Sequence, residues 1–358
     1  MKCPYNEKVD IKTNISQPVY FDGSFLENNS GIGRDSRNLL KACVKVFGGN
    51  LKIIYPSLSF LDKLRIVATG KVKRIQLPVG AIFIQSHIFG ILPETSTHQH
   101  IVRLHDLFPL TNPEWFRFAQ KRVFVCTFKA MGRNTKFICD SEFTEKILEN
   151  VTHASEFSSA VAYCPVDIPD SEQCDQCAVC NGYLPENFVL AVGTLEPRKN
   201  YVFIAKAWMS WRSQRRLDVN LVVCGNRGWK VTKILYWFRR AKKHGLIWLP
   251  HICDAGMKVL LEGAMGLVSA SKAEGFNLPV AEAALLGLKI AISDIGVHRE
   301  IYPNAFFFSI DNPDKVSFAF DYLTEGSRKH EISIIPHQVA VETLATCISE
   351  LAIYPYNL

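Results

Sequence analysis

The most informative segment of the sequence is a loop followed by the start of a helix, AEGFNLPVAEA (residues 273–283). Pro279 suits the first turn of a helix, where its missing N–H costs nothing, and residues 280–286 are rich in helix formers. We therefore expect Glu274 in the loop and Glu282 one turn into the helix. The free N–H groups of a first turn attract anions. A site between the two glutamates suits a phosphate whose attached hydroxyls bond to carboxylates, as in a phosphorylated sugar.

Two adjacent cations, Arg198 and Lys199, lie in VGTLEPRKN (residues 192–200), directly after the apolar run 188–192. We predict a buried strand for this run, so the cations belong to a strand-to-loop turn. The planar fork of arginine and the compact charge of lysine can together neutralise a departing diphosphate. Asp-x-Asp, the usual spacing for a metal held against a nucleotide diphosphate, occurs nowhere in the sequence. We expect metal-independent catalysis, with no metal ligand at the site.

Two further motifs lie in the N-terminal half: GIGR (residues 31–34), which opens a predicted helix, and HDL (residues 105–107), which follows a predicted strand. Gly31 and Gly33 allow a backbone to approach a diphosphate or an acceptor closely, although they also suit an ordinary helix N-cap turn. His105 begins a proline-containing loop. It is either a core histidine or a residue that contacts a sugar.

Four motifs in this order resemble glycosyltransferase family 4. They are GIGR, HDL with Pro109, Pro113, Glu114 and Trp115 behind it, PRKN, and the Glu-x7-Glu loop and helix. The similarity extends from about residue 18 to about residue 325. It implies an α/β fold of the GT-B type, with two Rossmann-like doubly wound domains facing a central cleft. It also implies a nucleotide-sugar donor and transfer with retention of the anomeric configuration.

The resemblance also assigns roles to individual residues. Arg198 and Lys199 are expected to bind the donor phosphates, Glu282 the ribose hydroxyls, and Glu274 the donor sugar or the leaving group. The catalytic set it implies is His105, Arg198, Lys199 and Glu274. The donor-binding set is Gly31, Gly33, Gly193, Arg198, Lys199, Glu274, Gly275, Phe276, Asn277, Leu278 and Glu282. Asn277 replaces the usual glycine of this loop. It tolerates a left-handed backbone and adds an amide near the sugar.

Strand and helix patterns alternate along the chain, which predicts parallel sheets with ligands at the carboxyl ends of their strands. We expect an N-terminal acceptor-side domain at 1–165, a proline-containing linker at 166–185 and a nucleotide-sugar-binding domain at 186–335. The resemblance gives residues 336–358 a helix that packs back on the N-terminal domain.

Composition agrees with a folded, soluble protein, which we expect in the cytoplasm: 48% of the 358 residues are hydrophobic, 21% are charged and the formal charge is +7. No segment has the roughly 18 apolar residues of a membrane span, and the N-terminus lacks the apolar core of a signal peptide. Basic residues interleave with aromatics at 115–137 and 229–243. These stretches are either covering helices with solvated charges or a peripheral contact with the inner face of the membrane. Nucleic acid is not an expected partner, because nothing beyond charge supports it.

The predicted linker contains Cys174, Cys177 and Cys180, a Cys-x2-Cys-x2-Cys run. A structural zinc needs a fourth ligand, for which the sequence offers only distant candidates such as Cys164. The sequence leaves open whether these cysteines bind metal or belong to an incidental, oxidation-sensitive loop.

The sequence favours a hexosyltransferase with a glycan or lipid-linked acceptor, in polysaccharide, O-antigen or glycolipid assembly. GDP-mannose is the preferred donor because the loop at 105–107 is similar to that of mannosyltransferases in the family, and UDP-glucose or another UDP-hexose stays open. Two other classes stay open. A nucleotide-dependent oxidoreductase lacks the third glycine of its fingerprint, since Ser36 takes that place. A non-catalytic two-domain sugar-binding protein has no reason to keep both cations and both glutamates.

Overall fold

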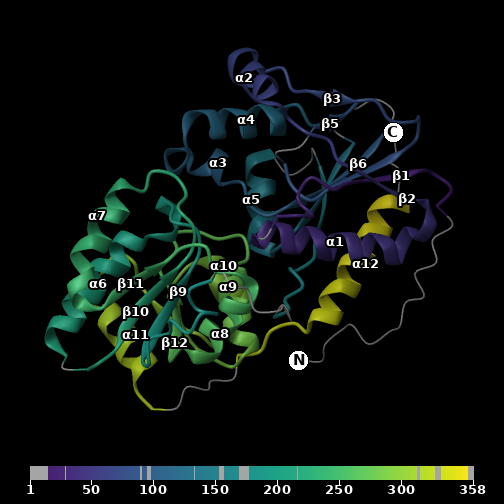
Figure 1. Ribbon diagram of the computed structural model, residues 1–358. Coiled ribbons are helices and arrows are strands. Elements are labelled where there is room, and N and C mark those ends of the chain that lie inside the picture. The colour runs from purple at the N-terminus through teal and green to yellow at the C-terminus, as the bar shows by residue number, and fades with distance from the viewer. Residues whose placement is uncertain are drawn as a thin grey trace.

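The computed structural model describes residues 15–28, 30–88, 91–94, 98–132, 134–152, 157–168, 177–215, 217–312, 315–326 and 332–353. These residues form two lobes, each built on a parallel six-stranded sheet with helices on both faces (Figure 1). The sheet of the first lobe uses strands between Val19 and Val161, and that of the second uses strands between Phe188 and Phe308. The fold class predicted from the sequence is confirmed.

The first sheet has the order β2-β1-β4-β6-β7-β8. Its strands are β1 (Val19–Asp22), β2 (Leu51–Ile54), β4 (Ile82–Gln85), β6 (Gln99–Leu104), β7 (Thr135–Cys139) and β8 (Ser158–Val161). Side chains of α1 (Gly31–Phe47) join the apolar core on one face, and those of α4 (Phe118–Lys129) and α5 (Glu142–Thr152) join the core on the other. The remaining elements are α2 (Phe60–Thr69), α3 (Phe108–Thr111) and the short pair β3 (Arg74–Ile75) and β5 (Leu92–Pro93).

The second sheet has the order β11-β10-β9-β12-β13-β14. Its strands are β9 (Phe188–Val192), β10 (Asn220–Cys224), β11 (Leu246–Leu249), β12 (Gly266–Ser269), β13 (Lys289–Ser293) and β14 (Phe306–Phe308). One face is covered by α6 (Tyr201–Gln214), α7 (Thr232–Ala241) and α11 (Lys315–Thr324), and the other by α8 (Asp254–Gly263) and α9 (Leu278–Leu285). A short helix, α10 (Gly296–Ile301), follows β13.

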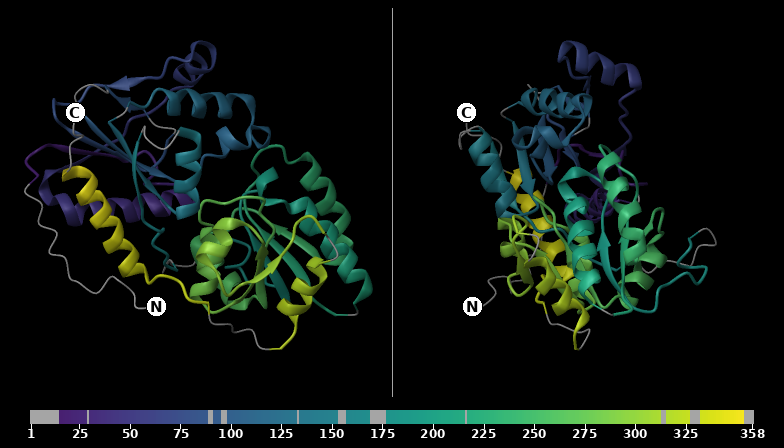
Figure 2. Two further views of the ribbon diagram at one scale, coloured as in Figure 1. Left: turned by 180° about the vertical axis from the view of Figure 1, so that it is seen from behind. Right: turned by 90° about the vertical axis from the view of Figure 1, so that its left-hand side faces the viewer.

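The last helix, α12 (His337–Ile353), leaves the second lobe and lies beside α1 (Figures 1 and 2). Leu344, Ala345 and Ile348 are buried in the apolar core formed by β1, β4 and α1. Lys136 of β7 donates a hydrogen bond to the Leu351 carbonyl at 2.5 Å. The core of the first lobe is therefore completed by residues that follow the second lobe in the chain.

Within the basic stretch at 115–137, α4 begins only at Phe118, because Pro113 opens a separate 3₁₀ turn before it. Helices α2 and α10 were not predicted. The domain bounds given above stay a prediction. None of the helices that the structure describes combines the length and hydrophobicity needed to span a bilayer.

Candidate active site

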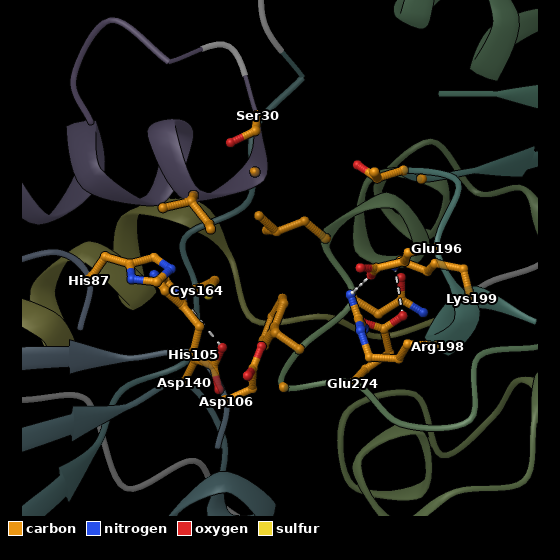
Figure 3. A pocket seen from close by; sticks show the side chains of 18 of the residues that line it. Ser30, His87, His105, Asp106, Asp140, Cys164, Glu196, Arg198, Lys199 and Glu274 are labelled. Atoms are coloured by element: carbon orange, nitrogen blue, oxygen red, sulfur yellow. Dashed lines mark hydrogen bonds and ion pairs between the residues drawn. The ribbon is translucent and has the colours of Figure 1, made fainter. Parts of the chain in front are cut away.

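The pocket that contains most of the predicted site residues lies between the two lobes and has a volume of about 530 Å³. Its walls come from the N-terminus of α1, the loops after β4, β6 and β7, the turn after β9, and the loop at 274–279. In Figure 3, His105, Asp106 and Asp140 lie on one side and Glu196, Arg198, Lys199 and Glu274 on the other. The carboxyl ends of both sheets therefore meet at one site, as expected for doubly wound folds.

The second-lobe wall is a buried network of charges. Glu274 contacts Lys199 Nζ through Oε1, at 2.7 Å, and Arg198 Nη1 through Oε2. Arg198 also lies 2.6 Å from Glu196 Oε1 and donates to the Ala273 carbonyl at 2.9 Å. Burial raises the pKa of Glu274, but Arg198 and Lys199 outweigh it and hold that pKa at about 2. Glu274 is therefore ionised at every physiological pH, and it fixes both cations at the pocket wall.

The loop at 274–279 has the backbone shape that the sequence predicts. Asn277 is left-handed, with φ 75° and ψ 60°, and α9 starts at the next residue with Pro279 in its first turn. The Tyr302 hydroxyl lies 3.0 Å from the Phe276 carbonyl and 3.1 Å from that of Asn277. The Asn277 amide lies 2.9 Å from His298 Nε2 and 3.3 Å from Ser269 Oγ. This amide thus hydrogen-bonds to neighbours in the protein, and Asn277 also lines the pocket.

Gly275 brings the two lobes into contact. A Cβ at this position would lie 1.8 Å from the His105 carbonyl oxygen and 3.0 Å from Asp140 Oδ2. Any side chain larger than hydrogen is therefore excluded while the lobes keep this arrangement. Leu278 makes a second contact, since a Cβ at Gly31 would lie 3.1 Å from its Cδ1. The loop that begins at His105 and the loop at 274–279 therefore meet at the pocket.

On the first-lobe wall, His105 lies among carboxylates. Its Nδ1 is 3.6 Å from Asp140 Oδ2, its Nε2 is 3.8 Å from Asp35 Oδ2, and Nε2 donates to the Ser86 carbonyl at 3.1 Å. Burial lowers the pKa of His105, but Asp140 and Asp35 outweigh it and raise that pKa above its usual value. The ring is therefore suited to carry a positive charge at the pocket wall.

A buried ion pair between Arg103 and Asp35 lies next to His105 on the first-lobe wall. Arg103 Nε donates to Asp35 Oδ2 at 2.8 Å, and Nη2 lies 3.3 Å from the Cys164 sulfur. Three possible metal ligands lie close together here: Asp35, His105 and Cys164. The Arg103 guanidinium already provides the positive charge that a metal ion would bring to them. Cys164 is therefore part of the first-lobe wall, and it is not the fourth ligand that the sequence analysis considered for the linker cysteines.

Asp106 links the two walls electrostatically. Burial raises its pKa to about 6, although Arg198 and His105 oppose the rise. Arg198 lies over the Phe108 ring, 5.6 Å from its centroid, so this cation reaches across the pocket. Its positive field acts on both walls at once.

Glu282 lies one turn into α9, as predicted, but it does not line the pocket. Its Oε1 is 2.5 Å from Nη1 of Arg34, which belongs to α1 of the other lobe and does line the pocket. Burial raises the pKa of Glu282 to about 7, although Arg34 lowers it. The Arg34 Nε atom is buried and has no hydrogen-bond partner among the described residues.

Most predicted site residues share one pocket. Its lining includes Gly31, Gly193, His105, Arg198, Lys199, Glu274, Gly275, Phe276, Asn277 and Leu278. Gly33 is not part of the lining; a Cβ there would lie 1.7 Å from the Asn28 carbonyl, so this glycine serves the turn before α1. At Gly193, φ is 141° and the carbonyl accepts a hydrogen bond from the Tyr201 hydroxyl at 2.7 Å.

Sequence reasoning missed Arg34, Asp35, Arg103, Asp140 and Glu196 as parts of the site. Two of them could have been recognised as site candidates from their positions in the sequence. Arg103 is a charge inside the apolar strand β6, and Asp140 follows directly after the carboxyl end of β7. A buried charge needs a partner, so Arg103 alone predicts a nearby carboxylate. The role of Arg34 becomes visible only when the lobes are placed together, whereas Asp35 and Glu196 pair with residues of their own lobe.

Comparison with known proteins identifies relatives of this chain. Residues 181–332 match the family described as Glycosyl transferases group 1. The serotype-specific mannosyltransferase WbdA of Escherichia coli is 29% identical over 240 residues, which cover 61% of this chain and 29% of WbdA. The O-antigen chain mannosyltransferase RfbU of Salmonella typhimurium is 26% identical over 214 residues, which cover 60% of this chain and 56% of RfbU. The matched region thus spans less than a third of WbdA.

Solved structures share the arrangement of both lobes. A structure described as trehalose-6-phosphate from E. coli bound with UDP-2-fluoro glucose has a TM-score of 0.62 at 12% identity, covering 95% of this chain and 100% of that one. WaaG, a glycosyltransferase involved in lipopolysaccharide biosynthesis, has a TM-score of 0.57 at 13% identity, covering 92% and 94%. These values establish the GT-B fold. The match of residues 181–332 to the glycosyl transferases group 1 confirms the family resemblance recognised from the motifs.

Proposed function

We propose that this chain is a retaining hexosyltransferase that transfers mannose from GDP-mannose to a hydroxyl of a glycan or lipid-linked acceptor. The observation that carries the proposal is the placement of Arg198, Lys199 and the first turn of α9 on one pocket wall, opposite His105. Cations and free N–H groups bind a diphosphate, and the facing histidine and carboxylates suit sugar hydroxyls.

The charge distribution supports a reaction in which the leaving group is an anion. When the bond between the anomeric carbon and the diphosphate breaks, negative charge grows on the phosphate oxygens. Arg198 and Lys199 are already fixed by Glu274, so they can stabilise that charge without reorganising. The acceptor hydroxyl then supplies the new bond and passes its proton to the leaving phosphate. No step in this scheme uses a metal ion.

The choice of mannose comes from the relatives. WbdA and RfbU carry mannosyltransferase in their names, and RfbU is named for the O-antigen chain. Assembly of a polysaccharide such as O-antigen is therefore the proposed setting. UDP-glucose and other UDP-hexoses are the competing donors.

The first lobe also supports a peripheral membrane contact. It presents the exposed apolar side chains of Phe60, Leu61, Leu64 and Phe118 beside basic residues of α2 and α4. Vesicle sedimentation would detect such a contact.

The decisive experiment incubates the chain with GDP-mannose, UDP-glucose and other UDP-hexoses, each in excess EDTA, and follows release of the nucleoside diphosphate. We expect release from GDP-mannose, and persistence of this activity in chelator. Release from a UDP-hexose alone would change the donor, and activity restored only by magnesium or manganese would contradict the metal-free mechanism. Binding of a sugar without turnover of any donor would favour the non-catalytic alternative, and reduction of a nicotinamide cofactor would favour an oxidoreductase.

Glu282 is proposed to accept the donor ribose hydroxyls beside Arg34. We expect Glu282→Gln to weaken binding of GDP, because a site built for hydroxyl groups loses affinity when its acceptor changes. The 2′,3′-dideoxy analogue of GDP should bind wild type and variant about equally poorly. Calorimetric titration of both proteins with both ligands measures the four affinities. An equal loss for both ligands would instead assign Glu282 to support of the loop.

The pH dependence of GDP binding tests the same residue. Because the Glu282 pKa is raised to about 7, its carboxyl is largely protonated at pH 6 and largely ionised at pH 8. Only the ionised form accepts with both oxygens, so affinity is expected to rise with pH in this window. Glu282→Gln keeps the shape but cannot titrate, and it removes the Glu282 share of the rise. A pH profile identical in the two proteins would contradict this assignment.

A further inference from the structure

A cluster of three cysteines lies in the second lobe, outside the pocket lining. Cys177 and Cys180 precede β9, and Cys253 is the N-cap residue of α8. Their sulfur atoms all lie within 4.8 Å of one another, and those of Cys180 and Cys253 are 3.5 Å apart. Cys253 is 73 residues beyond Cys180, so sequence spacing gives no hint of this cluster. Cys174, the first residue of the cysteine run, lies outside the described residues.

One backbone N–H group in the cluster points at a sulfur. Cys253 Sγ accepts from the Gly256 N–H at 3.3 Å, in the first turn of α8.

Space for this approach depends on Gly256. A Cβ at that position would lie 2.6 Å from Cys177 Sγ, so any side chain there would push the first turn of α8 away from the cysteine loop. Both the loop and the helix terminus therefore fit around the sulfurs.

We propose that Cys177, Cys180 and Cys253 supply three of the four ligands of a zinc ion that ties the segment before β9 to the N-terminus of α8. Zinc takes thiolate ligands at about 2.3 Å in tetrahedral geometry, which places neighbouring sulfurs roughly 3.8 Å apart. The 3.5 Å between the sulfurs of Cys180 and Cys253 is close to that spacing, and the limit of 4.8 Å for the other two pairs is compatible with it. The ion would hold the chain in place where it enters the second lobe.

A disulfide between Cys180 and Cys253 is the competing chemistry, because these sulfurs are the closest pair. A disulfide requires two sulfurs at about 2 Å, and it would leave the third sulfur, that of Cys177, outside the bond. The position of Cys177 within the same group favours zinc, which can take all three sulfurs as ligands.

The test uses the full chain, purified under reducing conditions, with elemental analysis and titration with Zn²⁺ alone. We expect one zinc per chain, and loss of that zinc in Cys177→Ser and Cys253→Ser. Cys126→Ser changes a partly exposed cysteine of α4 in the other lobe, and it should keep the full zinc content. Co²⁺ bound to the wild-type chain should show the charge-transfer absorption of a tetrahedral thiolate site, which keeps the test valid if a variant fails to fold.

Three results would overturn the proposal: no zinc bound by the reduced chain, undiminished zinc in both cluster variants, or a Cys180–Cys253 disulfide in peptide maps of chain prepared without oxygen. The proposal does not depend on the proposed transfer reaction. Zinc content and cobalt absorption are measured without substrate. An enzyme that lost activity in chelator and regained it with zinc, but not with magnesium, would place the metal effect at the cysteines.

Discussion

Replacing Arg198 by alanine is expected to lower turnover about a hundredfold, because one electrostatic contact with the developing diphosphate is typically worth on the order of 3 kcal/mol. The same change also removes partners of Glu196 and Glu274, which are both buried. Leaving a buried carboxylate without its partner costs about 3 kcal/mol or more of stability. A decrease in activity alone therefore does not separate a catalytic role from unfolding.

The double variant Arg198→Ala with Glu196→Gln separates the two effects. It removes one positive and one negative charge from the same ion pair, so much of the lost stability should return, whereas turnover should stay low. Arg215→Ala serves as a control, since it removes an arginine that pairs with Asp321 on the surface of the same lobe. Steady-state turnover and urea unfolding are measured for all three proteins. Recovery of turnover together with stability would exclude Arg198 from the chemistry.

Gly275→Ala is expected to lower turnover by about a hundredfold while leaving each lobe folded. The added Cβ would lie 1.8 Å from the His105 carbonyl oxygen, so the loop and the first-lobe wall must separate by roughly 1 Å. A displacement of that size between reacting groups costs about two orders of magnitude in rate. The diphosphate should still bind, because Arg198, Lys199 and the first turn of α9 all belong to the second lobe.

The matched control is Gly49→Ala, because a Cβ at Gly49 meets no atom within 4 Å. Both variants add one methyl group and remove one glycine from the unfolded chain. Turnover with GDP-mannose and calorimetric binding of GDP are compared for both. If Gly275→Ala kept turnover within about threefold of wild type, contact between the lobes at this glycine would not be needed for the reaction.

The fold was predictable because its determinants are local. Apolar runs such as residues 188–192 are long enough to mark buried strands, and Pro279 marks the start of α9. The elements that sequence reasoning missed are exposed or short. Helix α2 exposes Phe60, Leu61 and Leu64, so its apolar pattern does not indicate a buried face.

The site was predictable only where one loop carries several of its residues. The loop at 274–278 and the turn at 198–199 are continuous in sequence, and both line the pocket. The contact of Arg34 with Glu282 joins residues 248 positions apart, on different lobes, and no spacing rule reports such a pair. The same limit applies to Asp35, whose partner Arg103 lies on another element.

The path of α12 bears on how the chain folds during synthesis. The second sheet and its covering helices are contiguous between Phe188 and Thr324, so they are all available once that segment has left the ribosome. The first sheet, although synthesised earlier, waits for Leu344, Ala345 and Ile348 to cover one of its faces. Domains generally fold in the order of synthesis. Here the later-synthesised lobe is free to reach its native state first, while the earlier one keeps an apolar surface open to chaperones until translation passes α12.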